Sequence, residues 1–386
     1  MKLIIEPDAG VGPLLAAIKS AKKSVEIAIF RFDRRDVEAA LKAAAATKRV
    51  GVTAVIAFAN RGGEQTLRKL ELRFLDEGII VARSANDLIR YHAKYILIDR
   101  RVLYVLSFNF TRLDIDHSRG FGIVTTNANW VREAITLFEA DSGRTTYVPA
   151  KKTDTFIVSP TNSRKALGAF LRGAKTQLLI YDPKISDPEM RRILQERAKA
   201  GVEIKVIGSV SGRAEFDVQK LSGRRLHTRT IIRDRRQAFV GSQSLRTAEL
   251  DFRRELGLII RDSQAVRKLI ETFESDWTST SVKKASKETD MTKAEAAAAP
   301  EGDKADRAAR AVSDKEAEKA VQVFTKELDP LAVSVKKAVR VAVAKAGEDV
   351  LGDKGVKDTM KKVVKKAVKD AVKEAVHDAR ASKASA

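Results

Sequence analysis

The sequence predicts an α/β protein built from two similar lobes in tandem. Residues His92–Asp141 align with His227–Asp276 without a gap, and 16 of these 50 pairs are identical, where chance would give about three. In both copies, short segments typical of strands alternate with amphipathic patterns typical of helices. Such alternation indicates a sheet that is covered by helices.

The first lobe is expected at residues 1–150. Its strand-like segments occupy residues 2–6, 25–30, 52–58, 78–82, 94–99, 102–108 and 121–126. Apolar residues recur with helical spacing at 10–22, 36–49, 66–77 and 130–141. Each strand-like segment is short and rich in Val and Ile, as half-buried strands are.

The second lobe is expected at residues 151–282 and repeats this order. Its strand-like segments occupy residues 156–159, 178–182, 202–208, 230–234, 238–242 and 256–260. Two copies are too few for a solenoid, so the duplication predicts a two-lobed protein.

The C-terminal part of the chain differs in character. Residues 283–311 are polar and Ala-rich, which indicates a linker. Residues 312–386 are rich in Ala, Val and Lys, and near 360–376 the apolar residues recur on one face of a helix with lysines on the other. We expect a basic helical tail that contacts anionic lipid or DNA, or that stays a solvated or self-associating helix.

The charge of the chain favours partners that carry phosphate. The formal net charge is +22, and residues 1–282 hold 49 Lys/Arg against 33 Asp/Glu, so most of the excess lies on the lobes. Anionic lipid, nucleic acid and small phosphoesters all fit such a surface. The absence of cysteine excludes disulfides, thiolate metal sites and a cysteine nucleophile.

The apolar segments predict the location. The N-terminal apolar run ends at Glu6 and is too short for the core of a signal peptide. No stretch approaches the length of about 18 apolar residues that a membrane span needs. We therefore expect a cytoplasmic protein without a transmembrane segment, with peripheral membrane contact through its basic surface.

Two of the four histidines occupy equivalent positions in the duplication. His92 and Lys94 stand two apart in a strand-like run, and alternation along a strand would put both side chains on one face. His227 and Arg229 form the matching pair in the second copy. If equivalent faces of the lobes share one cleft, both histidines and both cations meet there.

This set of residues suits phosphodiester chemistry. One imidazole can attack phosphorus to give a phosphohistidine, and the other can protonate the leaving oxygen and then activate water or an alcohol. Lys94 and Arg229 can neutralise the non-bridging oxygens, so no metal or other cofactor is expected. Four polar residues can support phosphate binding: Ser107, Asn109, Ser242 and Ser244. Asp99 and Asp234 stand at odd separations from their histidines, so we interpret them as structural groups behind the site.

The pattern resembles the phospholipase D superfamily, whose signature is H-x-K-x-x-x-x-D, then a G-S-x-N-like segment and a later glutamate. "HAKYILID" from His92 matches the first part in full, whereas "HTRTIIRD" from His227 has arginine for lysine. "SFNF" in the first copy lacks the usual glycine, and "GSQS" in the second has serine for asparagine. The glutamate is Glu255 in the second copy, where the first copy has Gly120.

The resemblance covers residues 1 to about 282 and implies two tandem α-β-α sandwich lobes with one active site between them. It implies a metal-independent phosphodiesterase or phosphatidyltransferase of cardiolipin synthase or phospholipase D type. We take His92 as the nucleophile, because its copy keeps the lysine and the asparagine, and His227 as the general acid, oriented by Glu255. The reverse assignment of the histidines stays open.

The resemblance leaves the substrate open. A phospholipid is favoured over a nucleic acid as the phosphodiester, because aromatic residues for base stacking are few and lipid enzymes are frequent in the superfamily. A nuclease of the same superfamily, or an inactive module that binds phosphate or nucleic acid, are the alternatives.

Overall fold

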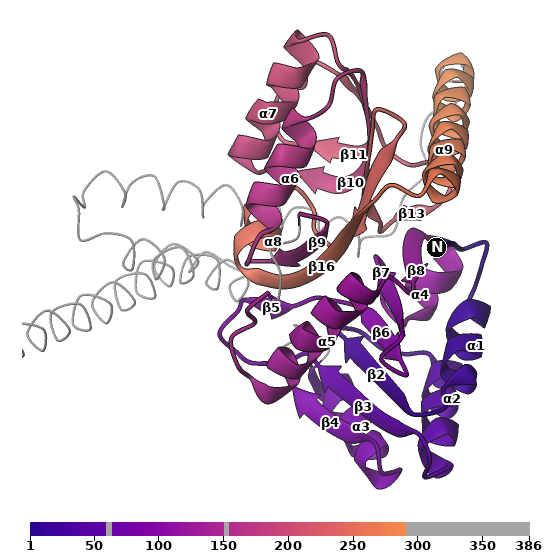
Figure 1. Cartoon of the computed structure of the whole chain (residues 1–386). Helices are drawn as coiled ribbons and strands as arrows, with labels where there is room; N and C mark the ends of the chain where they lie inside the picture. Colours follow the sequence, from indigo (N-terminus) through magenta and orange to yellow (C-terminus); the bar gives the residue numbers. More distant parts are fainter. Residues whose placement is uncertain (59–63, 150–153, 291–386) are drawn as a thin grey trace, which may run out of the picture. The chain divides into compact units, whose positions relative to one another are not determined.

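Two eight-stranded sheets, one for each copy of the repeat, form the framework of the protein. The computed structural model describes residues 1–58, 64–149 and 154–290 (Figure 1). Both sheets belong to a single structural unit. The predicted tail at 312–386 and residues 291–311 of the predicted linker lie outside the described residues.

The first sheet belongs to the N-terminal copy. Its strands are β1 (Lys2–Glu6), β2 (Ser24–Ile29), β3 (Gly51–Ile56), β4 (Ile80–Arg83), β6 (Tyr95–Ile98), β7 (Val102–Leu106) and β8 (Ser118–Thr125). They are ordered β1-β8-β7-β6-β2-β3-β4, and only β2-β3 and β3-β4 among these pairs are parallel. The helices are α1 (Gly12–Ser20), α2 (Arg35–Ala46), α3 (Glu64–Asp76), α4 (Arg112–His117) and α5 (Ala128–Gly143). α1 and α2 lie on one side of the sheet and α5 on the other (Figure 1).

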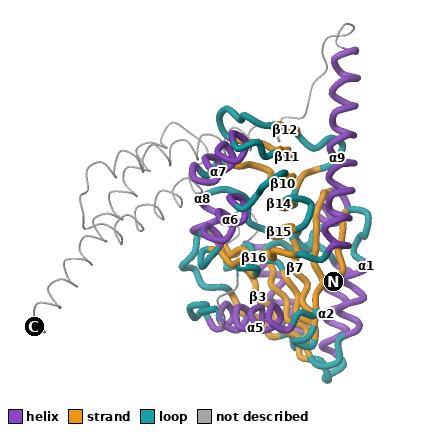
Figure 2. The backbone as a smooth tube through the Cα atoms, turned by 45° about the horizontal axis from the view of Figure 1, so that its top comes forward, coloured by secondary structure: helices purple, strands orange, loops and turns teal. Residues whose placement is uncertain are grey.

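The second sheet repeats this order. Its strands are β9 (Phe156–Ser159), β10 (Gln177–Ile185), β11 (Glu203–Val210), β12 (Asp217–Gln219), β14 (Arg229–Arg233), β15 (Gln237–Gly241) and β16 (Arg253–Ile260). They are ordered β9-β16-β15-β14-β10-β11-β12, which matches the first sheet strand for strand (Figure 2). The helices are α6 (Ser163–Arg172), α7 (Pro188–Lys199), α8 (Thr247–Asp251) and α9 (Ser263–Asp290). The expected pair of α-β-α lobes is confirmed.

Each sheet takes one further strand from the other copy. β5 (Arg90–Tyr91) pairs in parallel with β16 of the second lobe. β13 (Arg225–Leu226) pairs in parallel with β8 of the first lobe. β5 and β13 are equivalent in the repeat, so the exchange is reciprocal.

Two equivalent ion pairs also join the lobes. Nε of Arg119 on β8 lies 2.8 Å from Asp276 on α9, and Nε of Arg254 on β16 lies 3.0 Å from Asp141 on α5. All four residues are buried. The repeat therefore builds the same cross-lobe contact twice, in opposite directions.

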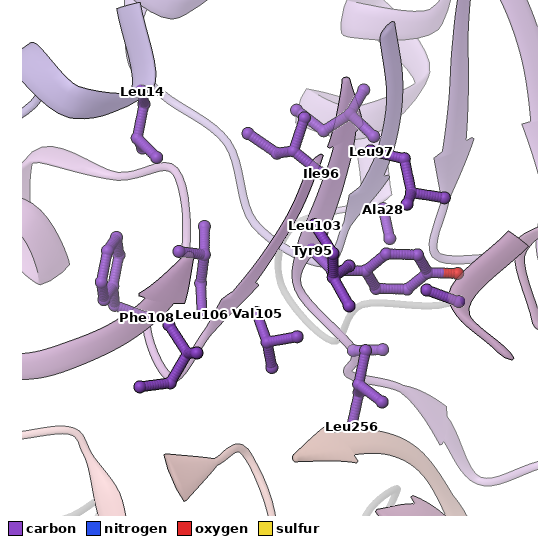
Figure 3. Packing of buried hydrophobic residues seen from close by; sticks show 14 of the residues in the cluster. Leu14, Ala28, Tyr95, Ile96, Leu97, Leu103, Val105, Leu106, Phe108 and Leu256 are labelled. Carbon is purple, nitrogen blue, oxygen red and sulfur yellow. The ribbon is translucent and has the colours of Figure 1, made fainter. Parts of the chain in front are cut away.

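The largest apolar cluster extends through both lobes. Leu256 of β16 belongs to the same cluster as Val105 of β7 and Tyr95 of β6 (Figure 3). A second cluster lies under α6 and α7 and includes Phe170 and Ile193. Because the main core is shared, neither lobe buries its apolar face alone.

The sequence predicts one strand through His92 and Lys94, and this is wrong at residues 92–94. β5 ends at Tyr91, which pairs with the second sheet, and β6 begins at Tyr95, which pairs with Ala28 of the first. The chain passes from one sheet to the other between them. A period-two pattern does not record this change of partner.

The predicted linker is also helical at its start. α9 continues to Asp290, past residue 283. Lys, Ala and Glu in this stretch favour helix, and the first proline after it is Pro300.

Candidate active site

His92 lies in the link between β5 and β6 and is 5% exposed. Its backbone amide donates to the carbonyl oxygen of Arg254 on β16, 2.8 Å away. Its Nδ1 lies 2.7 Å from Oε2 of Glu255, and Nζ of Lys94 lies 2.8 Å from both imidazole nitrogens. Lys94 and Glu255 are fully buried. The second lobe therefore holds both the backbone and the ring of the first histidine.

His227 occupies the equivalent link between β13 and β14 and is 6% exposed. Its backbone amide donates to the carbonyl oxygen of Arg119 on β8, 3.2 Å away. Its Nε2 lies 3.5 Å from Oδ2 of Asp114 on α4. Within the described residues, Nδ1 of His227 is buried and has no hydrogen-bond partner. The first lobe therefore holds the second histidine.

Asp114 is fixed by several donors and is 2% exposed. Its Oδ2 accepts hydrogen bonds from the backbone amide and the side-chain amide of Asn109, at 2.9 and 2.6 Å. Its Oδ1 accepts from Arg225 at 2.5 Å. The amide of Asp114 itself is capped by Thr111 at the start of α4.

The expectation that Glu255 orients His227 is wrong, because this carboxylate contacts His92 instead. Gly120 stands at the equivalent position of the first copy. A Cβ built there would lie 2.9 Å from Cδ1 of Phe108, so the packing leaves no room for a side chain. The carboxylate beside His227 comes from Asp114, six residues earlier in the chain.

The repeat carried a signal for Asp114 that motif reasoning missed. Asp114 is equivalent to Glu249 at the offset of 135. Each acid accepts a hydrogen bond from the backbone amide five residues before it, Asn109 in one copy and Ser244 in the other. Two acids at equivalent positions of the repeat, close in sequence to the basic motifs, could have been selected as candidate site residues from the sequence alone.

The side chain of Arg229 makes different contacts from that of Lys94. Its Nη1 donates to the carbonyl oxygen of His227 at 2.5 Å, and its Nε lies 3.8 Å from Oε2 of Glu249. Glu249 also accepts from Arg253 at 3.2 Å. The guanidinium group of Arg229 is thus held by a backbone carbonyl and one carboxylate, whereas the ammonium group of Lys94 contacts the imidazole of His92.

The predicted phosphate donors are engaged within the protein. Oγ of Ser107 accepts from the amide of Phe121 at 2.8 Å, and Oγ of Ser242 accepts from the amide of Leu256 at 3.2 Å. Ser244 donates to Asp182 through its hydroxyl. Of this group, Asn109 keeps a buried Oδ1 that has no hydrogen-bond partner among the described residues.

Asp99 and Asp234 anchor loops rather than the histidines. Asp99 accepts hydrogen bonds from the backbone amides of residues 22–24, at 2.6 to 3.0 Å. Asp234 accepts from the backbone amides of residues 175–177, at 2.7 to 3.1 Å. Both carboxylates fasten the chain where the second strand of each lobe begins.

The charges of the site act on both histidines at once. Burial lowers the pKa of His92 well below its usual value, and the positive charges of Lys94 and Arg229 lower it further. Burial also lowers the pKa of His227; Asp114 opposes this shift, while Arg229 and Lys94 add to it. Because the same two cations act on both rings, the histidines share one electrostatic environment.

The two carboxylates differ in their protonation. Burial and the negative charge of Glu249 raise the pKa of Glu255 to about 7. Burial acts to raise the pKa of Asp114 too, but the charges of His227 and Arg225 and the Asn109 hydrogen bonds lower it to about 2. At neutral pH, Asp114 is ionised and Glu255 is near its midpoint.

Comparison with known proteins identifies a family. Residues 14–142 and 171–277, one segment in each lobe, match the protein family described as "Cardiolipin synthase, PLD-like domain". The match takes in both histidine motifs and the acids Asp114, Glu249 and Glu255. No curated protein matches the chain.

Two solved structures share the fold over 71% of this chain. A polyphosphate kinase from Porphyromonas gingivalis superimposes with a TM-score of 0.60 and 21% identity, over 71% of this chain and 49% of that one. A phosphatidylserine synthase from Haemophilus influenzae Rd KW20 gives 0.53 and 10% identity, over 71% and 85%. Nuc from Salmonella typhimurium, a phospholipase D family member, gives 0.34 and 24%, over 39% and 97%. The chain thus spans about half the length of the kinase.

The length and apolar character of a helix determine whether it can cross a membrane. None of those within residues 1–58, 64–149 and 154–290 combines the length and the apolar character that crossing a membrane requires.

Proposed function

The chain belongs to the cardiolipin synthase family with phospholipase D-like domains, a family of phosphodiesterases and phosphatidyltransferases, and we propose that it acts on phospholipids through a phosphohistidine on His92 without a metal ion. The observation that carries this proposal is the pairing of each buried histidine with a carboxylate from the opposite lobe, Glu255 for His92 and Asp114 for His227. Imidazoles placed in this way serve as nucleophile and as general acid.

In the first step, His92 attacks phosphorus. Its low pKa keeps the imidazole neutral, and ionised Glu255 accepts a hydrogen bond from Nδ1–H, which fixes the tautomer whose lone pair lies on Nε2. A bond forms between Nε2 and phosphorus while the bond from phosphorus to the leaving oxygen breaks. Lys94 neutralises the charge that develops on the non-bridging oxygens.

The leaving oxygen takes its proton from His227. Asp114 favours the imidazolium form of this ring, and a bound phosphodiester anion favours it further. In the second step, His227 accepts a proton from water or an alcohol, whose oxygen attacks phosphorus and breaks the bond to Nε2. Water gives hydrolysis, and an alcohol gives phosphatidyl transfer.

The phospholipid substrate is supported by the family description, which names cardiolipin synthase, and by the positive charge of residues 1–282. An anionic lipid headgroup is attracted to such a surface. DNA is the alternative polyanion that the same charge would attract, so it enters the test as a competing outcome.

The test is hydrolysis in EDTA of bis(p-nitrophenyl) phosphate, phosphatidylglycerol vesicles, cardiolipin vesicles and DNA. We expect the wild type to turn over the small ester and a lipid, and His92→Ala and His227→Ala each to lose that activity. His117→Ala is the matched control, because this histidine is exposed at the end of α4 and should leave turnover unchanged. Turnover that survives in His92→Ala would overturn the mechanism, and cleavage of DNA alone would overturn the lipid assignment.

A further inference from the structure

Further cations lie near the two histidines, in addition to Lys94 and Arg229. An arginine stands two residues before each histidine, Arg90 in the first motif and Arg225 in the second. The positive charge of Arg90 lowers the pKa of His92, and that of Arg225 lowers the pKa of His227. A phosphodiester carries a single negative charge, and Lys94 lies directly beside the ring that would attack it.

The extra cations of the first motif gather on one aromatic ring. Phe30, which follows β2, lies edge-on to His92 with 4.6 Å between ring centroids. Cζ of Arg31 and Cζ of Arg90 each lie 5.5 Å from the Phe30 centroid, and Nζ of Lys94 lies 5.4 Å from it. Both guanidinium carbons are therefore at most about 10 Å from the centre of the His92 ring, the limit that these two distances set.

Arg31 is available to a ligand. Its residue is exposed, and among the described residues no carboxylate lies within 4.0 Å of its guanidinium group. Contact with the buried Phe30 ring restricts the guanidinium plane, which lowers the entropy lost when it binds an anion. A guanidinium group next to the reacting phosphate can donate two parallel hydrogen bonds to two oxygens of a second phosphate group.

The second motif does not offer the same surface. Arg225 is bound to Asp114 at 2.5 Å, which offsets its charge. The residue equivalent to Phe30 is Pro183, so no aromatic ring stands there. The aromatic ring with guanidinium groups beside it is thus a feature of the His92 side of the site.

We propose that Phe30, Arg31 and Arg90 form a subsite for a second phosphate group of the substrate, beside the scissile phosphate at His92. The inference rests on the proposed function, because it takes the scissile phosphate to lie at the histidine pair. The preferred substrate then carries two phosphates joined by a short linker, either the glycerol of a lipid headgroup or a nucleoside. Phe30 and Arg31 shape the subsite, and Arg90 connects it to the histidine motif.

Matched substrates that differ by one phosphate test this subsite. One pair is phosphatidylglycerol and phosphatidylglycerophosphate in vesicles; the other is thymidine 3′-(p-nitrophenyl phosphate) with and without a 5′-phosphate. We expect the wild type to favour the member with the second phosphate by about tenfold or more in kcat/KM in one pair, the value of one charge-assisted contact. The pair that shows the preference identifies the linker.

The variants are Arg31→Ala and Arg90→Lys, and the control is Arg49→Ala. Arg31→Ala should abolish the preference and change turnover of the one-phosphate member by less than about threefold, since Arg31 binds the second phosphate and not the scissile one. Arg90→Lys should keep part of the preference, because charge is retained without the fork of donors. Arg49 is exposed and precedes the opposite end of the parallel strands, before β3, so its variant should behave as wild type.

A binding measurement separates the subsite from catalysis. In the His92→Ala background, thymidine 3′,5′-bisphosphate should bind about tenfold more tightly than thymidine 3′-phosphate, and Arg31→Ala should remove the difference. Equal affinity for the two nucleotides together with equal turnover within both substrate pairs, or a preference that survives Arg31→Ala, would overturn the inference. If the wild type turns over none of the four substrates while the bisphosphate preference holds, the proposed function fails and the subsite stands.

Discussion

The backbone amide of His92 donates to the carbonyl oxygen of Arg254, 2.8 Å away on the opposite lobe. Arg254 is in turn held by Asp141 at 3.0 Å and by the carbonyl oxygen of Ser159 at 3.1 Å. The position of the proposed nucleophile therefore depends on a buried ion pair between the lobes.

Arg254→Ala should destabilise the protein strongly, because it leaves the buried carboxylate of Asp141 unpaired. Loss of one partner of a buried pair costs about 3–5 kcal/mol, and we expect a loss of that order in the free energy of unfolding, measured by urea denaturation. The double variant with Asp141→Asn should recover part of this loss. Equal stability of the single and double variants would contradict the idea that the unpaired charge causes the effect.

The pH dependence of turnover should report Glu255. Its pKa is raised to about 7 by burial and by Glu249, and its ionised form stabilises the positive charge that develops on His92 when Nε2 attacks phosphorus. For bis(p-nitrophenyl) phosphate, whose leaving group needs no proton from His227, we therefore expect kcat/KM to rise with pH through an apparent pKa of about 7. In Glu255→Gln the amide oxygen still accepts a hydrogen bond from Nδ1 of His92 but carries no charge at any pH, so the pH profile of this variant should be flat across that range and about tenfold lower. A variant that keeps the rising limb would assign that limb to another group.

Asp114 should act by positioning His227 as the general acid. Asp114→Asn is expected to lower turnover of phosphatidylglycerol by about ten- to a hundredfold, the value of a charge-assisted interaction. The loss should be much smaller for bis(p-nitrophenyl) phosphate, because p-nitrophenolate leaves without a proton. Asp116→Asn is the control, since that carboxylate binds Arg34. Equal losses on both substrates would indicate a merely structural role.

A trapped intermediate should identify the nucleophile. In His227→Ala, bis(p-nitrophenyl) phosphate can still phosphorylate His92, but the residue that activates water is missing, so the adduct accumulates. Alkaline quenching and peptide mass spectrometry should locate the added phosphoryl group on the peptide that contains His92. An adduct on His227 in the His92→Ala protein would reverse the assignment.

Much of the fold could be predicted because the duplication fixes equivalent strands and helices in both copies. The strand that follows Lys94 and the helix that contains Phe138 follow from periodicity. The partners of β5 and β13 could not be predicted, because local patterns are the same whichever sheet a strand joins.

The residues of the candidate site were predictable from the motifs, but their contacts were not. Spacing places Glu255 a fixed distance along the chain from His227, yet the fold brings it to His92. The reason lies in long-range packing: Phe108 occupies the space beside Gly120, and Asp114 approaches from α4. The equivalence of Asp114 and Glu249 was the one trace of this arrangement in the sequence.

The reciprocal pairing of β5 and β13 has the form of an isologous contact, in which each half gives the other what it receives. A single ancestral copy could have built this site only as a symmetric homodimer with identical halves. Covalent fusion removed that constraint and allowed division of labour. One half carries Lys94 and has Gly120 at the position of the glutamate, while the other carries Glu255 and has Arg229 at the position of the lysine.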